Sequence, residues 1–238
     1  MTFLRSLLFF VYFITLSVVL CIVCVPLLLG PREGAGWLGR TWSRAVFWGL
    51  RVIAGTRYEV RGVVPTEAVL VAIKHMSMWD TCAIYTVLGD PAIVLKRGLQ
   101  MIPFYGWYLW KSGMIPIDRD GKASALRNMV AAAKRELARG RSVVIFPEGT
   151  RKKPGAPPDY KPGVAGLYGQ LGLPCVPVAL NSGQFWTGFI KKPGAIVMEF
   201  LPPIPPGLPR RQFMPALEEA IEGATARLLA EGNLSATS

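Results

Sequence analysis

The chain contains a single histidine, His75, and a carboxylate, Asp80, stands five residues after it. Residues five apart on one continuous helix point about 140° away from each other, so these side chains can meet only if the chain turns after His75 and a helix begins near Asp80. An imidazole with a carboxylate on one ring nitrogen keeps a fixed tautomer, and its other nitrogen can take a proton from a hydroxyl. On the spacing alone, a lone histidine with Asp80 as a helix N-cap is the simpler interpretation.

Two further segments combine charged residues with backbone that can turn tightly. Phe146–Arg151, with the sequence Phe-Pro-Glu-Gly-Thr-Arg, ends a strongly hydrophobic run, and Gly113–Arg119 closes on an Asp-Arg pair. Arginine binds phosphate through two parallel hydrogen bonds, so Arg119 and Arg151 at two strand ends could converge on one phosphate. Each segment alone is also consistent with a surface turn or with an ion pair inside the segment.

From Tyr58 onward, short β-branched runs alternate with helical segments. The expected strands are Tyr58–Arg61, Ala68–Ile73, Ala92–Leu95, Met114–Ile117, Ser142–Phe146, Cys175–Leu180 and Ala195–Phe200. Ser124–Arg139 predicts an amphipathic helix that Gly140 ends. This alternation indicates an α/β fold with a largely parallel central sheet flanked by helices, whose functional site lies at the strand ends.

The first residues follow a different pattern. Leu7–Leu29 carries no charge over 23 residues, which at about 1.5 Å per residue crosses a hydrocarbon core of roughly 30 Å. The run predicts a membrane helix; it is too long for the apolar core of a secretory signal, and no small-x-small cleavage site follows it. Only Arg5 precedes the run, whereas arginines at positions 32, 40, 44, 51, 57 and 61 follow it. The positive-inside rule therefore predicts that the C-terminal body lies in the cytoplasm.

Trp37–Ile53 predicts a second N-terminal helix, on which Arg40, Arg44 and Arg51 share a narrow stripe. Such a stripe on an apolar, tryptophan-rich helix suits a membrane interface, and a core helix with a solvated arginine edge fits equally well. We therefore expect an N-terminal membrane-anchoring helical segment over residues 1–55 and a main domain over residues 56–238.

Composition narrows the range of partners. The chain is 51% hydrophobic yet carries a net charge of +12, a pairing expected of a protein that meets anionic lipid or a phosphorylated ligand. Nucleic acid is not expected, because the longest basic run is only Arg151–Lys153. One histidine and no cluster of cysteines or carboxylates leave no plausible metal site, and Cys21 and Cys24 lie inside an apolar run. The absence of GxSxG and GxxxxGK[ST] motifs weighs against a serine hydrolase and a phosphate-loop kinase.

Taken in order, the segments resemble the glycerolipid acyltransferase family and, within it, the 1-acylglycerol-3-phosphate acyltransferases. His75–Asp80 matches the first motif, HxxxxD; Gly113–Arg119 resembles the second; Phe146–Arg151 is the third, FPEGTR, without departure; and Val176–Leu180 looks like the fourth. Pro116 stands where the family usually has an aromatic residue, while the Asp-Arg pair that closes this motif is retained.

The resemblance implies transfer of a fatty acyl group from an acyl thioester, acyl-CoA or acyl-carrier protein, to the sn-2 hydroxyl of 1-acylglycerol-3-phosphate. The product is phosphatidic acid, in phospholipid biosynthesis. His75 would act as the general base on the acceptor hydroxyl and Asp80 would orient it, with no acyl-enzyme. The substrate-binding residues that the resemblance implies are Arg119, Glu148, Gly149, Arg151 and Lys96. It implies no metal and no cofactor besides the acyl donor.

Two alternatives remain open. Another lysolipid, such as a lyso-ornithine lipid, would use the same His75 and Asp80, and either donor suits the positive charge because both are acidic. Outside the enzymes, a non-catalytic membrane lipid-binding protein with the same fold is the alternative, and the intact His75 and Asp80 weigh against it. The expected partners are membrane lipids, a lysophospholipid acceptor and the acyl donor, with no nucleic acid. The expected location is the membrane, specifically a bacterial inner membrane with the catalytic domain, residues 56–238, on the cytoplasmic side.

Overall fold

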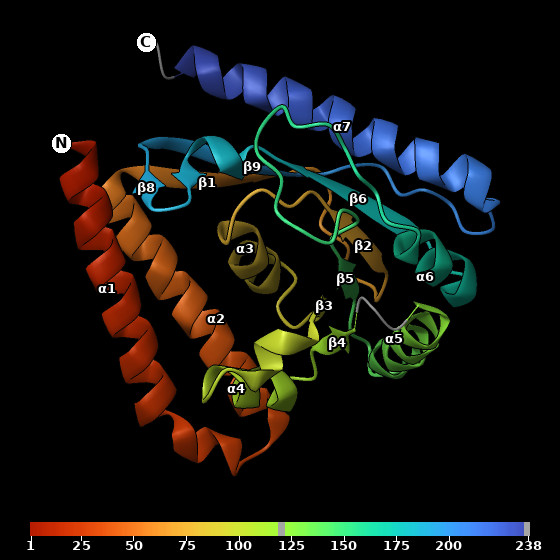
Figure 1. Ribbon diagram of the computed structural model, residues 1–238, viewed down its shortest axis with the longest axis horizontal. Helices are drawn as coiled ribbons and strands as arrows, with labels where there is room; N and C mark the ends of the chain where they lie inside the picture. Colours follow the sequence, from red (N-terminus) through yellow and green to blue (C-terminus); the bar gives the residue numbers. More distant parts are fainter. Residues whose placement is uncertain (119–121, 236–238) are drawn as a thin grey trace.

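A seven-stranded sheet forms the centre of the computed structural model, which describes residues 1–118 and 122–235 (Figure 1). Its strands are β1 (Thr56–Arg61), β2 (Leu70–Ile73), β3 (Ala92–Lys96), β4 (Ile115–Ile117), β5 (Val143–Ile145), β6 (Cys175–Leu180) and β9 (Gly194–Phe200). They lie in the order β1-β9-β6-β2-β5-β3-β4, and every neighbouring pair is parallel except β6 and β9. The predicted α/β fold with a largely parallel sheet is confirmed. β7 (Trp186–Thr187) and β8 (Ile190–Lys191) form a separate hairpin whose strands are too short for a sequence pattern to predict.

Helices cover both faces of the sheet because successive strand side chains point to opposite faces. Val71 and Ile73 of β2 belong to a core shared with the N-terminal helices and α3, whereas Leu70 and Ala72 belong to a core shared with α5, α6 and α7. The helices are α1 (Thr2–Val23), α2 (Arg32–Gly49), α3 (Trp79–Val87), α4 (Tyr105–Lys111), α5 (Lys122–Leu137), α6 (Gly163–Leu171) and α7 (Arg210–Ser235). The carboxyl ends of β2 and β5 therefore open between two helical layers.

The predicted membrane run is not one helix. α1 begins earlier than expected, at Thr2, and ends at Val23; the remainder of the run forms a short 3₁₀ turn, η1 (Val25–Leu28), and then doubles back into α2. Pro26 lies in η1 and has no backbone N–H to donate, so the α-helical ladder cannot continue through it. The result is an antiparallel helical hairpin with an apolar closed end at η1 (Figure 1).

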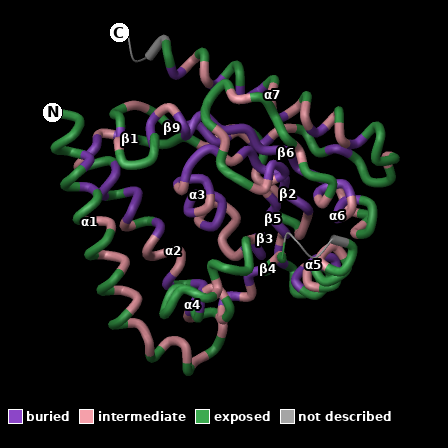
Figure 2. The backbone as a smooth tube through the Cα atoms, viewed as in Figure 1, coloured by how far each residue is buried: buried purple, intermediate pink, exposed green. Residues whose placement is uncertain are grey.

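α1 is the one helix in the described ranges that is long and apolar enough to cross a membrane. Most of its side chains remain exposed along the outer side of the molecule (Figure 2). Two contacts hold its ends: the Lys191 backbone N–H of β8 donates to Ser6 Oγ at 2.9 Å, and Tyr108 Oη of α4 donates to the Cys21 carbonyl at 3.1 Å. α1 is thus docked on the domain while its apolar outer face stays uncovered.

The second helix also differs from expectation. α2 begins at Arg32, directly after Pro31, and continues through a π-helical turn, η2 (Leu50–Ala54), which Gly55 ends at φ +74°. The expected arginine stripe is divided: Arg44 and Arg51 are exposed, but Arg40 donates to the Gly89 carbonyl at 2.7 Å. One arginine of the predicted stripe is therefore bonded to the rest of the protein, and the other two remain at the surface.

Candidate functional site

The turn that follows β2 brings the lone histidine to its carboxylate. The Lys74 N–H continues the strand pairing by donating to the Val178 carbonyl at 3.0 Å, after which the chain leaves the sheet. α3 begins at Trp79, so Asp80 stands in its first turn. His75 Nδ1 and Asp80 Oδ2 are 2.9 Å apart. The strand end and the helix start together supply the geometry that a continuous helix could not.

Asp80 is fully buried, and both of its oxygens receive hydrogen bonds. Oδ2 accepts the Met76 and Ser77 backbone N–H groups at 2.7 and 2.8 Å, in addition to the His75 contact. Oδ1 accepts the hydroxyls of Ser77 and Ser182 at 3.0 and 2.5 Å. A buried ionised carboxylate is tolerated when several donors compensate for its lost hydration. This carboxylate therefore holds the Nδ1–H tautomer of the imidazole firmly.

His75 lies at the boundary between this buried network and a cavity. Its ring stacks on Phe146 with the centroids 4.0 Å apart, and its side chain is 12% exposed. Because Nδ1 is engaged by Asp80, Nε2 is the ring nitrogen left for a group in the cavity, whose wall includes His75. An imidazole fixed by stacking and by a carboxylate can accept a proton from a hydroxyl without reorienting.

The cavity has a volume of about 1540 Å³, larger than the roughly 300–1,000 Å³ of a pocket for one drug-sized ligand. The N-terminal helices supply an apolar part of its wall, which includes Phe13, Ile14, Val18, Leu20, Leu38 and Trp42. Polar side chains come from the loop after β5 and from segments near α5 to α7: Asp118, Thr150, Arg151, Asp159, Lys161 and Arg210. Since α1 and α2 lie on the opposite side of the molecule from α5 and α6 (Figure 1), these charged side chains lie toward the end away from the N-terminal helices, among apolar residues of α5 and α6 such as Leu126, Met129 and Val164. We call this end of the cavity the polar end.

The remaining predicted site residues are placed differently from one another. Lys96 is exposed at the end of β3 and lines the cavity, as does Arg151, whose side chain makes no hydrogen bond or ion pair with any residue the structure describes. Gly149, at φ +65°, closes the turn after β5 through its N–H to the Phe146 carbonyl at 2.9 Å. A glycine meets this left-handed backbone at low cost. Arg119 lies outside the described residues.

Glu148 belongs to a buried ion-pair cluster instead of projecting freely into the cavity. It is 1% exposed, and its Oε1 accepts from Lys74 Nζ at 3.1 Å. Lys74 also bonds Glu222 of α7 at 2.7 Å, and Tyr160 Oη donates to the same Glu222 at 2.9 Å. Burial raises the pKa of Glu148, and the neighbouring Lys74 opposes this only in part. Glu148 Oε2 has no hydrogen-bond partner within the described ranges.

Four residues of this site escaped the sequence reasoning: Lys74, Ser77, Ser182 and Glu222. Ser77 lies inside the His75–Asp80 segment, and Lys74 is a charge that directly follows the four buried residues of β2, so both carried a local signal. Ser182 and Glu222 are 102 and 148 residues from their partners Asp80 and Lys74. Only the folded chain brings them there.

The cysteine that α3 places on the cavity wall is not a ready covalent nucleophile. Cys82 lines the cavity, but burial raises its pKa to about 12, so it stays a thiol near neutral pH. No group of three or more His, Cys, Asp or Glu side chains suited to a metal occurs in residues 1–118 and 122–235. The arrangement favours proton abstraction by His75 from a bound hydroxyl.

Comparisons with known proteins agree with this geometry. A protein from Pseudomonas aeruginosa named 1-acyl-sn-glycerol-3-phosphate acyltransferase is 38% identical over 161 residues, covering 66% of this chain and 63% of that protein. The 1-acyl-sn-glycerol-3-phosphate acyltransferase alpha of Mus musculus is 30% identical over 179 residues, covering 72% of this chain and 63% of its own length. The aligned chain thus spans less than two thirds of the length of these relatives.

The fold has a match among solved structures. The crystal structure of the 1-acyl-sn-glycerophosphate (LPA) acyltransferase PlsC from Thermotoga maritima superposes with a TM-score of 0.76 at 19% identity, over 96% of this chain and 99% of that one. A family model described as acyltransferase matches residues 57–181, which include His75, Asp80 and the whole Phe146–Arg151 segment. Because that match covers more than half of the chain, the chain belongs to the acyltransferase family.

Proposed function

We propose that the protein transfers a fatty acyl group from an acyl thioester to the sn-2 hydroxyl of 1-acylglycerol-3-phosphate, which yields phosphatidic acid. The observation that carries the proposal is His75, held through Nδ1 by a buried Asp80 at the wall of a cavity with an apolar and a polar end. A lysophospholipid has the same division into an acyl chain and an anionic head. The names of the Pseudomonas and mouse relatives support the same acceptor.

The reaction follows from the geometry of the imidazole. His75 Nε2 takes the proton of the acceptor hydroxyl while the oxygen attacks the thioester carbonyl carbon. The tetrahedral intermediate collapses by breaking the carbon–sulfur bond, and the imidazolium returns its proton to the departing thiolate. The products are an ester and a free thiol, and no acyl-enzyme forms. Asp80 keeps Nδ1 protonated and stabilises the imidazolium that forms transiently.

The polar end of the cavity holds the acceptor phosphate in this proposal. Arg151, exposed on the cavity wall, supplies a guanidinium without a described partner, and Lys96 and Arg119 complete the set that we assign to phosphate. Gly149 shapes the acceptor site by allowing the tight turn before Arg151. Glu148 shapes it indirectly, because its side chain is bonded to Lys74.

The N-terminal segment, residues 1–55, anchors the protein in this proposal, and residues 56–238 form the catalytic domain. The apolar helix α1 supports membrane association, and the arginines that follow the apolar run support a cytoplasmic catalytic domain by the positive-inside rule. We assign the protein to a bacterial inner membrane, where acyl-CoA and acyl-carrier protein are both accessible donors.

The test is acyl transfer by the purified, detergent-solubilised full chain. Both donors are offered with 1-acylglycerol-3-phosphate, a lyso-ornithine lipid, other lysophospholipids and monoacylglycerol, with His75→Ala alongside and its folding checked by circular dichroism. We expect transfer to 1-acylglycerol-3-phosphate that is lost in the variant. Transfer only to another lysolipid would replace the acceptor but retain the chemistry, whereas undiminished transfer by His75→Ala would refute the mechanism.

Phosphate recognition is tested in the same assay. Arg151→Ala should raise the KM for 1-acylglycerol-3-phosphate about 10-fold and leave monoacylglycerol, which lacks phosphate, nearly unaffected. Arg139→Ala is the matched control, because Arg139 is exposed on the segment after α5 and does not line the cavity. Equal KM changes for both acceptors would separate Arg151 from the phosphate.

A further inference from the structure

A second exposed apolar surface, separate from that of α1, lies on the segment between β3 and β4. This segment consists of a 3₁₀ turn, η3 (Arg97–Met101), followed by α4. Met101, Trp107 and Trp110 are 81%, 50% and 73% exposed. Soluble proteins seldom expose several large apolar side chains this close together without a partner. We call Arg97, Met101, Trp107, Trp110 and Lys111 the η3–α4 surface.

This surface continues the exposed face of α1. Tyr108 of α4 is buried against Leu38 of α2 and against apolar side chains of η1 and the last turn of α1. Its hydroxyl donates to the Cys21 carbonyl, which fixes α4 beside the closed end of the N-terminal hairpin (Figure 1). Leu29, next to that closed end, is 91% exposed. Any layer of lipid that covers the end of the hairpin therefore also reaches α4.

The charge of the segment selects the kind of partner. Between Asp90 and Asp118 the chain carries no carboxylate side chain, while Lys96, Arg97 and Lys111 are basic. Exposed tryptophan beside lysine and arginine is typical of segments at the headgroup level of a bilayer, and anionic lipid attracts basic residues near its surface. A protein partner would need carboxylates opposite these cations, but a phospholipid surface supplies both the apolar layer and the anions.

Backbone geometry at the start of α4 also points to a role for the exposed rings. Phe104 precedes the helix with φ +61°, a backbone conformation that bulky residues rarely adopt. Phe104 packs on Trp107 with ring centroids 5.0 Å apart. Phe104 and Trp107 thus form a partly exposed aromatic pair at the start of α4.

We propose that the η3–α4 surface is a second bilayer-contact surface, which inserts into the headgroup layer of an anionic phospholipid membrane beside α1. The cavity wall includes Ile102, Phe104 and Tyr105 from this segment and Ile14 and Val18 from α1. Lipid contact on both sides places that part of the wall at the bilayer surface, so an acyl chain reaches His75 without crossing water. The inference rests on membrane association of α1, not on the identity of the acceptor.

Fluorescence quenching tests the contact directly. The full chain is bound to vesicles of phosphatidylethanolamine and phosphatidylglycerol with brominated acyl chains, and wild type is compared with Trp107→Phe/Trp110→Phe. Trp79→Phe is the control, because Trp79 is fully buried in the core. The emission lost in the double variant should be quenched at least two-fold by bromine, and that lost in Trp79→Phe should not. If bromine quenches neither the emission lost in the double variant nor that lost in Trp79→Phe, the proposal is wrong. It is also wrong if wild type does not bind the vesicles.

A second measurement uses Trp107→Gln/Trp110→Gln and, separately, Arg97→Gln/Lys111→Gln. None of these side chains lines the main cavity. Transfer to acceptor embedded in anionic vesicles should fall several-fold, and transfer to a short-chain acceptor below its micelle concentration should stay within two-fold of wild type. Equal losses in both assays would mean that the residues support the site, not lipid contact.

If wild type forms dimers on sedimentation and the variants do not, a second copy of this chain covers the surface, and the lipid proposal fails.

Discussion

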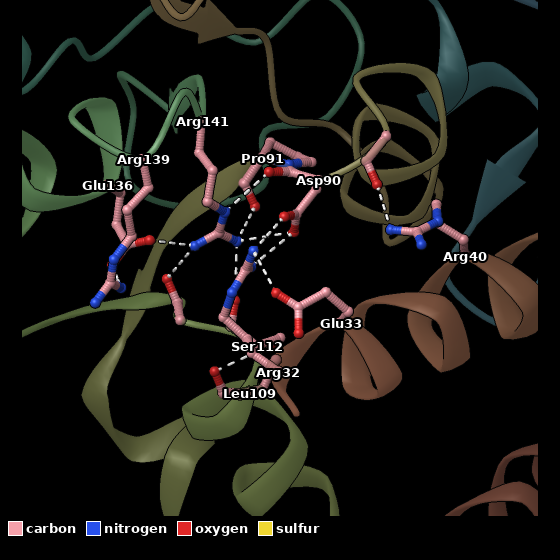
Figure 3. A network of polar contacts seen from close by, with 12 residues as sticks. Arg32, Glu33, Arg40, Asp90, Pro91, Leu109, Ser112, Glu136, Arg139 and Arg141 are labelled. Atoms are coloured by element: carbon pink, nitrogen blue, oxygen red, sulfur yellow. Dashed lines mark hydrogen bonds and ion pairs between the residues drawn. The ribbon is translucent and has the colours of Figure 1, made fainter. Parts of the chain in front are cut away.

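Two buried polar networks, each centred on one charged side chain, differ in where their hydrogen bonds end. Asp80 collects donors from Met76, Ser77 and Ser182, and its last bond goes to His75, which borders the cavity. Arg141 is 3% exposed and bonds two carboxylates, Glu136 and Asp90 (Figure 3). Its remaining bonds go to the carbonyls of Asp90, Pro91, Ser112 and Gly113.

The difference separates a reactive site, the Asp80 network, from a purely structural one. We call the Arg141 network, with Arg32, Asp90 and Glu136, the clamp. The guanidinium nitrogens of Arg141 donate to backbone carbonyls and to the carboxylates of Glu136 and Asp90. Arg32 of α2 also binds Asp90, at 2.8 and 3.1 Å (Figure 3). That network ties the N-terminal hairpin and the segments around α4 and α5 together and leaves nothing to react. The Asp80 network leaves one ring nitrogen unused at a cavity. Both centres are buried and charged, so the unused ring nitrogen is the feature that distinguishes the site.

The largest expected effect comes from the same substitution made once in each network. Asp80→Asn should lower kcat by roughly 10³-fold, because an amide can no longer hold the Nδ1–H tautomer or balance the imidazolium. Asp90→Asn should leave kcat within about two-fold and lose only stability. Acyl-transfer kinetics combined with thermal melting measure both. Similar activity losses in the two variants would remove the distinction between site and clamp.

The clamp should give the converse result. Arg141→Met should lower the free energy of unfolding by about 3 kcal/mol, since Glu136 and several carbonyls lose a buried donor. The matched control is Arg139→Met: Arg139 binds the same Glu136 but is 60% exposed, and such a surface ion pair contributes at most about 1 kcal/mol. Urea unfolding measures the difference, and the kcat of folded Arg141→Met should equal that of wild type. Loss of kcat without loss of stability would place Arg141 in the site.

A smaller effect should come from the far end of the Asp80 network. Ser182→Ala removes one donor to Oδ1 while Ser77 retains the other, so kcat should fall about 10-fold with an unchanged KM. Ser142→Ala, which deletes a hydroxyl bonded to backbone away from the cavity, is the control and should leave kcat unaffected. A rise in KM at constant kcat would show that Ser182 acts on substrate binding and not through Asp80.

Local patterns were sufficient for the sheet and for the centre of the site. Each strand is a β-branched run between turns, so its position follows from period and composition, as in Cys175–Leu180, which matches β6 at both ends. The His75–Asp80 spacing is equally local, because the turn and the helix start that unite the pair lie within six residues. Sequence reasoning succeeded where the partners are neighbours along the chain.

Long-range contacts could not be read in the same way. α7 crosses the far side of the sheet and brings Glu222 to Lys74; no helix was predicted there, although Phe213, Leu217, Ile221, Ala224 and Leu228 recur at helical spacing and are buried. The break of the N-terminal run at Pro26 was missed because hydropathy ignores backbone donors. The assignment of Glu148 to the acceptor site likewise overlooked its partner, since Lys74 lies 74 residues away. For Glu222 and Glu148 the deciding contact depends on the folded chain, whereas Pro26 is a local signal that a reading of hydropathy alone does not use.

Glu148 shares a buried ion pair with the clamp type of network and a place at the cavity with the Asp80 network. Its substitution should have the smallest effect. Its folded pKa is raised above the ordinary value of about 4.5 by burial, so the folded state binds more protons than the unfolded state above pH 4.5. The stability that the neutral carboxyl contributes is complete below pH 4.5 and is lost as pH rises through the folded pKa. Glu148→Gln should remove that slope and leave the protein folded at pH 7, because Lys74 retains Glu222.

Urea unfolding of wild type and Glu148→Gln between pH 4 and pH 8 measures the slope, with Glu67→Gln, an exposed carboxylate, as the control. A flatter profile for Glu148→Gln would group Glu148 with the clamp, as a buried carboxyl that supports the turn before Arg151. An unchanged profile with reduced kcat would group it with Asp80 instead, and its unpaired Oε2 would then be a second polar group available to the cavity. The pH profile of stability and the kcat of Glu148→Gln together decide whether this carboxyl belongs with Arg141 or with Asp80.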